Sequence, residues 1–344
     1  MNNTLNKDYP FRKGNIKQPS QKNIDRVCHK SLKDFTVFRS YIMLLFMPAS
    51  IKSAFAYLDV VIRKFFMVQY LQKIHFCNIP IHHVDHELDE KVPFDTDYLD
   101  TYLGFVNFWL RPMSMLSRRF GMTDGAKIGG EYLCYIKRAY NEAYRIYSTT
   151  MTTTYRPYSE DKRIIKMRKA DPHFLCVPSL HIAIIFLTCG FFEMIFEREH
   201  FTQEEKDRWN KELYDEAIAI GESVLYVKQH SVNCIPAALY MMTSICPELF
   251  DDSYALKFID SLFRNAEDIS EDDCQNIREH IRFTYQKFCL EGSYEKDWTI
   301  PVLNWLKGYR SYEPYYAVYK KRRLYGKVVR FVRRKHFKYR RKYS

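Results

Sequence analysis

Apolar residues recur at every third or fourth position along most of this chain, and no other feature restricts its fold more. This spacing places apolar side chains on one face of an α-helix, whereas a half-buried strand would show them at every second position. We find no alternating run long enough to build a sheet. Glycine and proline, which interrupt helices, supply only 11 and 13 of the 344 residues. The sequence therefore predicts an all-α protein that folds as a helical bundle.

Ten helices are expected, and segments with polar residues, glycine and proline separate them. They are expected near residues 31–46, 51–76, 98–120, 130–149, 179–198, 203–229, 235–244, 255–265, 272–290 and 300–307. Four breaks between them are clear, at residues 122–126, 154–161, 246–249 and 291–297. No segment is rich enough in Gly, Ser or Pro to divide the core. We therefore expect a disordered polar N-terminus over residues 1–30, one helical domain over 31–310 and a basic tail over 311–344.

The excess of basic residues is confined to the C-terminal end. From Lys320 to Ser344 there are 13 lysines and arginines and no acidic residue, while the rest of the chain holds 40 basic and 41 acidic residues. The net charge of +12 therefore belongs to this tail. Its bases are interleaved with Tyr, Phe and Val, as in segments that meet anionic surfaces. We expect it to bind an anionic membrane surface, with nucleic acid as the less favoured partner and a solvated terminus as the simplest alternative.

Cysteine usage and hydropathy indicate the cellular compartment. The nine cysteines are scattered and form no C-x-x-C pair, as in reduced intracellular proteins, and the N-terminus lacks the apolar segment of a secretory signal. The longest uncharged stretches, residues 174–192 and 231–247, are near or just under the roughly 20 residues that a membrane-spanning helix needs, and proline interrupts each. We therefore expect an intracellular, peripheral membrane protein, with integral insertion as the alternative.

One histidine-rich segment could be taken for a metal site. His82, His83 and His86 lie among carboxylates in residues 79–90, and imidazole and carboxylate suit several divalent ions. Their spacing matches no known ligand pattern, and the acidic neighbours are typical of a solvated loop. We therefore expect neither a metal ion nor another cofactor.

A short polar motif interrupts the apolar segment Phe174–Ile185. Its centre reads Pro178-Ser179-Leu180-His181, and proline is favoured in the first turn of a helix. The free amide groups of that turn can bind an anion such as phosphate together with the Ser179 hydroxyl, and His181 would then face the same pocket. A capped helix with a hydrogen-bonded histidine explains this motif equally well.

Two flanking segments favour a phosphate site. Arg156 precedes Pro157 in an expected loop, and a guanidinium suits bidentate contact with phosphate oxygens. Downstream, Ser223 and His230 are seven positions apart, a spacing that predicts one shared face of a helix. Lys228 points elsewhere on that helix, and its long side chain can bend toward the same cavity. The candidate site residues are therefore Arg156, Ser179, His181, Ser223, Lys228 and His230.

In this order the segments resemble the three motifs of the type 2 phosphatidic acid phosphatase superfamily, which also includes bacterial acid phosphatases and vanadium haloperoxidases. The motifs are K-x6-R-P, P-S-x-H and S-R-x5-H-x3-D. The second is complete here as PSLH, the first keeps Arg156-Pro157, and the third keeps Ser223 and His230. The pattern S-x4-K-Q-H is similar to a branch with lipid phosphatases and inositol phosphotransferases. The resemblance covers about residues 130–245 and implies a helical bundle of the haloperoxidase type.

The resemblance also implies a role for each residue. His230 would attack phosphorus and form a phosphohistidine, and His181 would protonate the leaving alkoxide. Arg156, Ser179 and Lys228 would bind the phosphoryl oxygens, with Ser223 beside them. The implied substrate is a phosphomonoester or a phosphorylated lipid, and no metal is required.

Three positions depart from the family pattern. Thr149 replaces the lysine of the first motif, and Val224 and Cys234 replace the arginine and aspartate of the third. Lys228 lies one helical turn after Val224 and can restore the lost positive charge. A thiol does not hold an imidazole as a carboxylate does, and losing an orienting acid can cost up to ~10⁴-fold in rate. Activity therefore requires a carboxylate from elsewhere in the fold, and Glu222 is a candidate.

Three functions are consistent with the sequence. The first is a phosphoesterase or phosphotransferase that acts on a phosphomonoester or lipid phosphate through a phosphohistidine. The second is a catalytically degenerate relative that binds phosphate without turning it over. The third is a helical adaptor that binds anionic membrane or nucleic acid through its basic tail.

Overall fold

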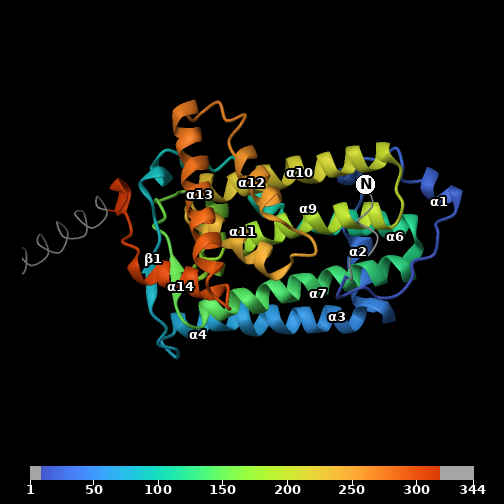
Figure 1. Ribbon diagram of the computed structural model, residues 1–344, viewed down its shortest axis with the longest axis horizontal. Helices are drawn as coiled ribbons and strands as arrows, with labels where there is room; N and C mark the ends of the chain where they lie inside the picture. The colour runs from blue at the N-terminus through green and yellow to red at the C-terminus, as the bar shows by residue number, and fades with distance from the viewer. Residues whose placement is uncertain (1–8, 318–344) are drawn as a thin grey trace, which may run out of the picture.

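The computed structural model describes residues 9–317, most of which form α-helices packed in a bundle (Figure 1). The predicted all-α class is confirmed. Long helices run roughly along the longest axis of the bundle. They are α3 (Pro48–Val60), which continues through the π-helical segment η2 (Val61–Met67) into α4 (Val68–Lys73), α6 (Phe105–Arg119), α7 (Gly121–Tyr147), α9 (Leu180–Arg198) and α10 (Gln203–Tyr226).

Shorter elements complete the bundle. The C-terminal helices pack on one another, and α11 also packs on α9. They are α11 (Cys234–Ile245), α12 (Asp252–Ser261), α13 (Glu271–Gly292) and α14 (Thr299–Gly308). The other short helices are α1 (Gln21–Asp25), η1 (Leu32–Asp34), α2 (Phe38–Phe46), η3 (Glu87–Glu90), α5 (Leu99–Leu103) and α8 (Lys162–Ala170). Sequence periodicity anticipated most of these helices, but it did not predict α1, η3 or α8.

Helix α9 forms the centre of the core because it is apolar on all sides. It packs against α6, α7, α10 and α11, and side chains such as Phe186 and Phe191 are fully buried. Among the described residues, α9 is the one single helix whose length and hydropathy would allow it to cross a membrane, and 83% of its apolar window is buried in protein. Helix α2 together with α3–α4 passes the same test only as a pair bent by 95°.

The break expected at residues 122–126 is wrong, because these residues lie inside α7. The glycines of this region permit close helix packing instead of ending a helix. A Cβ atom at Gly125 would lie 2.9 Å from Met43 Sδ, and one at Gly129 would lie 2.6 Å from Leu44 Cδ2. The true boundary is Gly121, whose φ of +82° is a left-handed conformation that glycine adopts without strain.

A small parallel sheet joins two segments that were expected to be irregular. Strand β1 (Ile81–His83) pairs with β2 (Met151–Thr153) in the register Ile81↔Met151 and His83↔Thr153. Strand β2 lies between α7 and the loop that contains Arg156, so this pairing directs the chain toward that loop. His83 stacks on Tyr155 at 3.9 Å between ring centroids, and in residues 9–317 no group of three or more His, Cys, Asp or Glu side chains is arranged to hold a metal ion.

Residues 9–30 pack on the bundle, which corrects the expectation of a disordered N-terminus over 1–30. The Phe11 ring lies 4.8 Å from the Tyr135 ring, and Val27 is fully buried. At the other end, the Tyr316 hydroxyl donates to the Tyr155 carbonyl at 3.1 Å, so the first residues of the expected tail contact the bundle. Residues 1–8 and most of the expected basic tail, residues 318–344, lie outside the described residues.

Candidate functional site

The first turn of α9 holds the PSLH motif in place. Ser179 is the N-cap residue, and its hydroxyl oxygen accepts a hydrogen bond from the Ile182 amide at 3.4 Å. The Ser179 amide donates to the Cys234 carbonyl at the start of α11, at 3.3 Å. The Tyr147 hydroxyl on α7 donates to the Pro178 carbonyl at 2.5 Å. Three helices therefore fix the backbone that carries Ser179 and His181.

The two histidines of the candidate site converge in space although 49 positions separate them in the chain. His230 Nε2 lies 3.3 Å from His181 Nδ1 and 3.3 Å from Ser179 Oγ. The two rings meet edge to face, with centroids 5.4 Å apart. The structure therefore brings together one hydroxyl and two imidazoles, which is the central geometric expectation from the sequence.

Two of the other expected residues point away from this group. Helix α10 ends at Tyr226, and Lys228 has a φ of +54°, so the chain leaves the helix before His230. The Lys228 ammonium donates to the backbone carbonyls of Asp89 and Val92, and the Ser223 hydroxyl donates to the Ile220 carbonyl at 2.8 Å. The expectation that Ser223 and His230 share a helix face is therefore wrong, and Lys228 does not reach the cavity.

Both histidines have depressed pKa values. His230 is 8% exposed, and burial, followed by the neighbouring His181 and His173, lowers its pKa well below the usual 6.5. Burial likewise lowers the pKa of His181 to about 4. Both rings are therefore neutral at pH 7, which leaves one nitrogen lone pair on each ring available for nucleophilic attack or for accepting a proton.

The histidines border a small cavity of about 30 Å³, which has room for one or two water molecules. Phe65 and Gln69, from the α3–α4 helix, form one wall, and Tyr102 of α5 forms another. The rings of Tyr102 and Phe105 lie 4.9 and 4.8 Å from the His181 ring. A tetrahedral anion would have to separate the His181 and His230 rings, which now contact each other.

Arg156 contacts a residue that lines the cavity, and Arg168 lies near Arg156. The Arg156 guanidinium donates to Gln229 Oε1 at 3.4 Å, directly beside His230, and burial lowers its pKa while the charge of Asp171 opposes that effect. Arg168 of α8 donates from Nη1 to the Pro157 carbonyl at 2.5 Å. Burial and the charge of Arg156 lower its pKa to about 10. Within residues 9–317, neither guanidinium forms an ion pair within 4 Å of a carboxylate.

Arg168 was missed by the sequence reasoning. Its Nε and Nη2 atoms are buried without a hydrogen-bond partner among the described residues, so this side chain has donors available for an anion. The signal was the run of basic residues at 162–169, between the Arg-Pro and PSLH motifs. By contrast, Thr149 donates to the Arg145 carbonyl at 3.1 Å and adds no charge to the site.

A carboxylate does reach the cavity, but it is Asp171, which the sequence reasoning also missed. Its Oδ1 accepts a hydrogen bond from the His173 amide at 3.0 Å. Burial alone would raise its pKa, but hydrogen bonds from His173 and the charge of Arg156 outweigh it and lower the value to about 2. The resulting negative charge raises the pKa values of His181 and His230, against the effect of burial.

Neither Cys234 nor Glu222 takes the role of the aspartate that the third motif would place at position 234. The Cys234 sulfur accepts from the Ser231 amide at 3.4 Å, and after burial it is the next cause that raises the pKa of the buried Cys176 thiol. His230 Nδ1 is buried without a hydrogen bond of regular geometry to any described residue, although the Cys176 backbone contributes a weak interaction that favours the protonated ring. No carboxylate therefore orients His230 through Nδ1 in residues 9–317.

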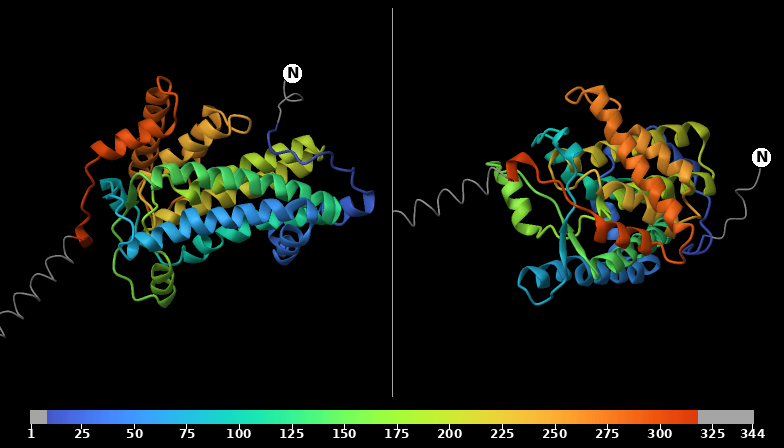
Figure 2. Two further views of the ribbon diagram at one scale, coloured as in Figure 1. Left: turned by 90° about the horizontal axis from the view of Figure 1, so that it is seen from below. Right: turned by 60° about the vertical axis from the view of Figure 1, so that its left-hand side comes forward.

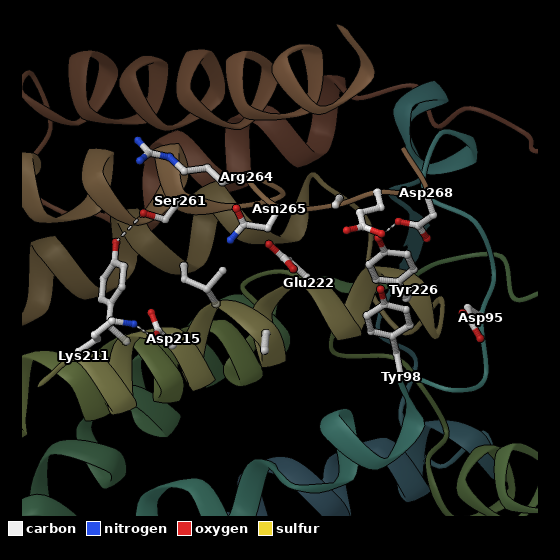
Figure 3. Close-up of a pocket in the computed structure, with 15 residues that line it drawn as sticks. Asp95, Tyr98, Lys211, Asp215, Glu222, Tyr226, Ser261, Arg264, Asn265 and Asp268 are labelled. Carbon is white, nitrogen blue, oxygen red and sulfur yellow. Dashed lines mark hydrogen bonds and ion pairs between the residues drawn. The ribbon is translucent and has the colours of Figure 1, made fainter. Parts of the chain in front are cut away.

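Glu222 belongs to a different pocket, of about 750 Å³, which shares no lining residue with the histidine cavity (Figure 3). Its Oε1 accepts from the Phe263 amide at 2.5 Å, and burial raises its pKa to about 7. Figure 3 shows it beside the stacked rings of Tyr98 and Tyr226, which are 3.8 Å apart. Glu222 is therefore not the orienting acid of His230.

Comparison with models of protein families and with curated proteins finds no match to this sequence, and comparison with solved structures finds none either.

Proposed function

We propose that the protein is a phosphoesterase or phosphotransferase that acts on a phosphomonoester or a lipid phosphate and uses His230 as the nucleophile. One observation carries this proposal: His230 Nε2 lies 3.3 Å from both Ser179 Oγ and His181 Nδ1. Nucleophile, proton donor and oxygen-binding hydroxyl are thus grouped where a phosphoryl group would bind. The same grouping supports kinship with the type 2 phosphatidic acid phosphatases, including their helical fold, and this kinship is part of the proposal.

The first chemical step forms a bond from His230 Nε2 to phosphorus and breaks the bond from phosphorus to the alcohol oxygen. A neutral His230 is suited to this attack, and its depressed pKa keeps it neutral. The departing oxygen takes a proton from His181. A bound phosphate dianion supplies the negative charge that raises the pKa of His181 from about 4, so the acid is protonated when the substrate is present.

Cations stabilise the charge on the transferred group. Arg156 donates a hydrogen bond to Gln229, the residue directly before His230. Arg168 has two buried donor atoms, Nε and Nη2, without a hydrogen-bond partner among the described residues. Ser179 Oγ–H would donate to a third oxygen. The oxygen of water or of a second alcohol then bonds to phosphorus, the bond from phosphorus to His230 Nε2 breaks and restores the neutral imidazole, and His181 takes the proton of the attacking oxygen. The basic C-terminal tail would hold the protein on anionic membrane, where lipid phosphates are located.

Turnover and a covalent intermediate provide the test. The purified protein is incubated with phosphatidic acid in mixed micelles and with short-chain phosphomonoesters, and phosphate release is measured. We expect release from at least one of them, an acid-labile phosphoryl group on His230 by mass spectrometry, and loss of both in a folded His230→Asn variant. Release that persists in this variant would overturn the assignment of the nucleophile.

A second candidate is a relative that binds phosphate without turnover. Cys234 at the aspartate position and the buried, unsatisfied Nδ1 of His230 favour it. In that case vanadate or phosphate would raise the melting temperature of the protein, and no substrate would be hydrolysed. Arg156→Gln and Arg168→Gln should remove this shift. Arg163→Gln is the matched control on α8, because Arg163 is exposed and already pairs with Asp100 and Asp161.

A further inference from the structure

An apolar stripe follows the outer face of the continuous helix α3–η2–α4. It consists of Phe55, Leu58, Ile62, Phe66, Tyr70 and Ile74, whose exposed fractions range from 37% to 68%. Successive members are three or four positions apart, so they lie along one side of the helix.

The opposite face of the same helix is also apolar. Ala54, Val61 and Val68 are buried, and α3 and η2 pack there against α7. An ordinary surface helix presents polar residues to water on the face away from the core. This helix presents a row of large apolar side chains instead, and a contiguous exposed apolar patch of this kind marks an interaction surface.

Basic groups border the apolar stripe. Lys52 and Lys73 are exposed near its two ends, and the acidic Asp59 within it is paired with Arg63. The Tyr70 hydroxyl donates to the Ala170 carbonyl at 2.5 Å and so joins the stripe to the end of α8. Helix α8 exposes Lys162, Lys166 and Lys169. Figure 2 shows α8 standing out from the bundle beyond the long helices.

We propose that the apolar stripe inserts into the interfacial region of an anionic membrane while α8 contacts the lipid headgroups. Apolar side chains flanked by lysine and arginine are the combination that holds monotopic helices in that region. The described chain ends at Ala317, at the same end of the bundle as α4, and 13 of the 27 residues that follow are lysine or arginine (Figure 1). Like charges disfavour a second copy of this chain as the occupant, because two strongly basic surfaces would meet.

The helix that carries the apolar stripe also forms part of the histidine cavity, so membrane binding and the candidate site are related. Phe65 and Gln69, on the same helix as the apolar stripe, line the histidine cavity, and Leu103 and Val106 are exposed close in sequence to Tyr102, which lines it too. A membrane on the stripe would bring phosphorylated headgroups near His181. This link to catalysis rests on the proposed function, whereas membrane insertion itself does not.

The experiment measures binding of the full-length chain to sedimented vesicles of phosphatidylcholine, with and without phosphatidylserine. We expect binding to the anionic vesicles and at least ~10-fold weaker binding by the triple variant Phe55→Ser, Ile62→Ser, Phe66→Ser. The matched control is Phe283→Ser, Leu290→Ser, Tyr294→Ser, which removes three apolar side chains from α13 and the loop after it that are more exposed than those of the triple variant, and it should bind normally. Circular dichroism confirms that both variants are folded.

Two further measurements separate the possible failures. His230→Asn should bind vesicles as well as the unmodified protein does, so loss of the enzyme hypothesis would leave this result intact. The triple variant should hydrolyse a soluble phosphomonoester at the normal rate if the chain is a phosphoesterase. Equal vesicle binding by the triple variant and the unmodified protein would overturn the proposal, as would a dimer in sedimentation equilibrium that the same triple variant dissociates.

Discussion

The turn that begins α9 and the segment that follows α10 each supply one histidine to the same cavity, yet they differ in how the supporting residues lie. In the α9 turn, Ser179 and His181 both face His230. From the end of α10 onward, His230 and the preceding Gln229 reach the cavity, while Ser223 and Lys228 bond to backbone carbonyls elsewhere. A motif confined to one helix turn kept its geometry, and a motif spread over seven positions did not.

The difference has a local cause. The α9 motif lies within one N-terminal turn, where the cap fixes the positions of adjacent residues. The second motif crosses the end of a helix. The left-handed conformation of Lys228 redirects the chain between Ser223 and His230, so helical periodicity no longer relates them.

The largest expected effect separates the roles of the two histidines. His181→Asn should lower the rate on an alkyl phosphate by ~10² to 10⁴, because the alkoxide then leaves without a proton. An aryl phosphate with an acidic phenol needs little protonation and should lose far less. His230→Asn should abolish both reactions. Steady-state rates on the two substrates measure the contrast, and an equal loss on both in His181→Asn would contradict its role as the acid.

A smaller effect compares the two serines. Ser179→Ala should reduce kcat/KM by about 10- to 100-fold, because it removes a hydrogen bond to a charged oxygen. Ser223→Ala should stay within about 2-fold, since this hydroxyl only donates to the Ile220 carbonyl. Both assays are run well below each melting temperature, because Ser179 also caps α9. Equal losses of kcat/KM in the two variants would indicate that Ser223 belongs to the active site.

A third comparison concerns two carboxylates, Asp171 in the histidine cavity and Glu222 in the separate pocket. The charge of Asp171 favours protonated His181, so Asp171→Asn should lower the pKa of the bound acid. The alkaline limb of the kcat profile should then move to lower pH by about one unit or less, with a several-fold loss of rate at pH 7. Glu222→Gln, in the separate pocket, should leave that limb in place. A limb that moves only in Glu222→Gln would favour the carboxylate expected from the sequence.

The smallest effect on activity is expected for Lys228→Met, which should act on stability alone. Burial lowers the pKa of Lys228 from 10.5 to about 8, so the unfolded chain binds more protons between these values. The unfolding free energy of the unmodified protein should therefore rise relative to Lys228→Met as the pH increases from 8 to 10.5, by about 3 kcal/mol at most. Urea unfolding measures the difference, and a loss of phosphate binding in this variant would place Lys228 in the site after all.

Much of the bundle was predictable from the sequence because its helices are amphipathic or wholly apolar, and both patterns are visible in the chain. The predicted break at residues 122–126 failed because Gly125 and Gly129 fit close packing against Met43 and Leu44, and close packing cannot be distinguished from a turn without the partner helix. Helix α8 was missed because its short basic sequence lacks a wide apolar face.

The candidate site was predictable where its residues belong to a recognisable motif. PSLH identified Ser179 and His181, and motif order identified Arg156 and His230. Arg168 lies on a helix that the sequence analysis did not expect, where the basic run at residues 162–169 was its one local signal, and Asp171 follows that helix without a motif of its own.

The sequence by itself determined the helical class and the local chemistry of the α9 cap, because both depend on residues within a few turns of one another. Only the tertiary structure decided that His181 and His230 meet across 49 positions, that Lys228 turns away, and that the exposed side of α3–η2–α4 is apolar. The physical reason is that helical periodicity shows which residues share a face. What that face contacts is decided by the packing of the other helices.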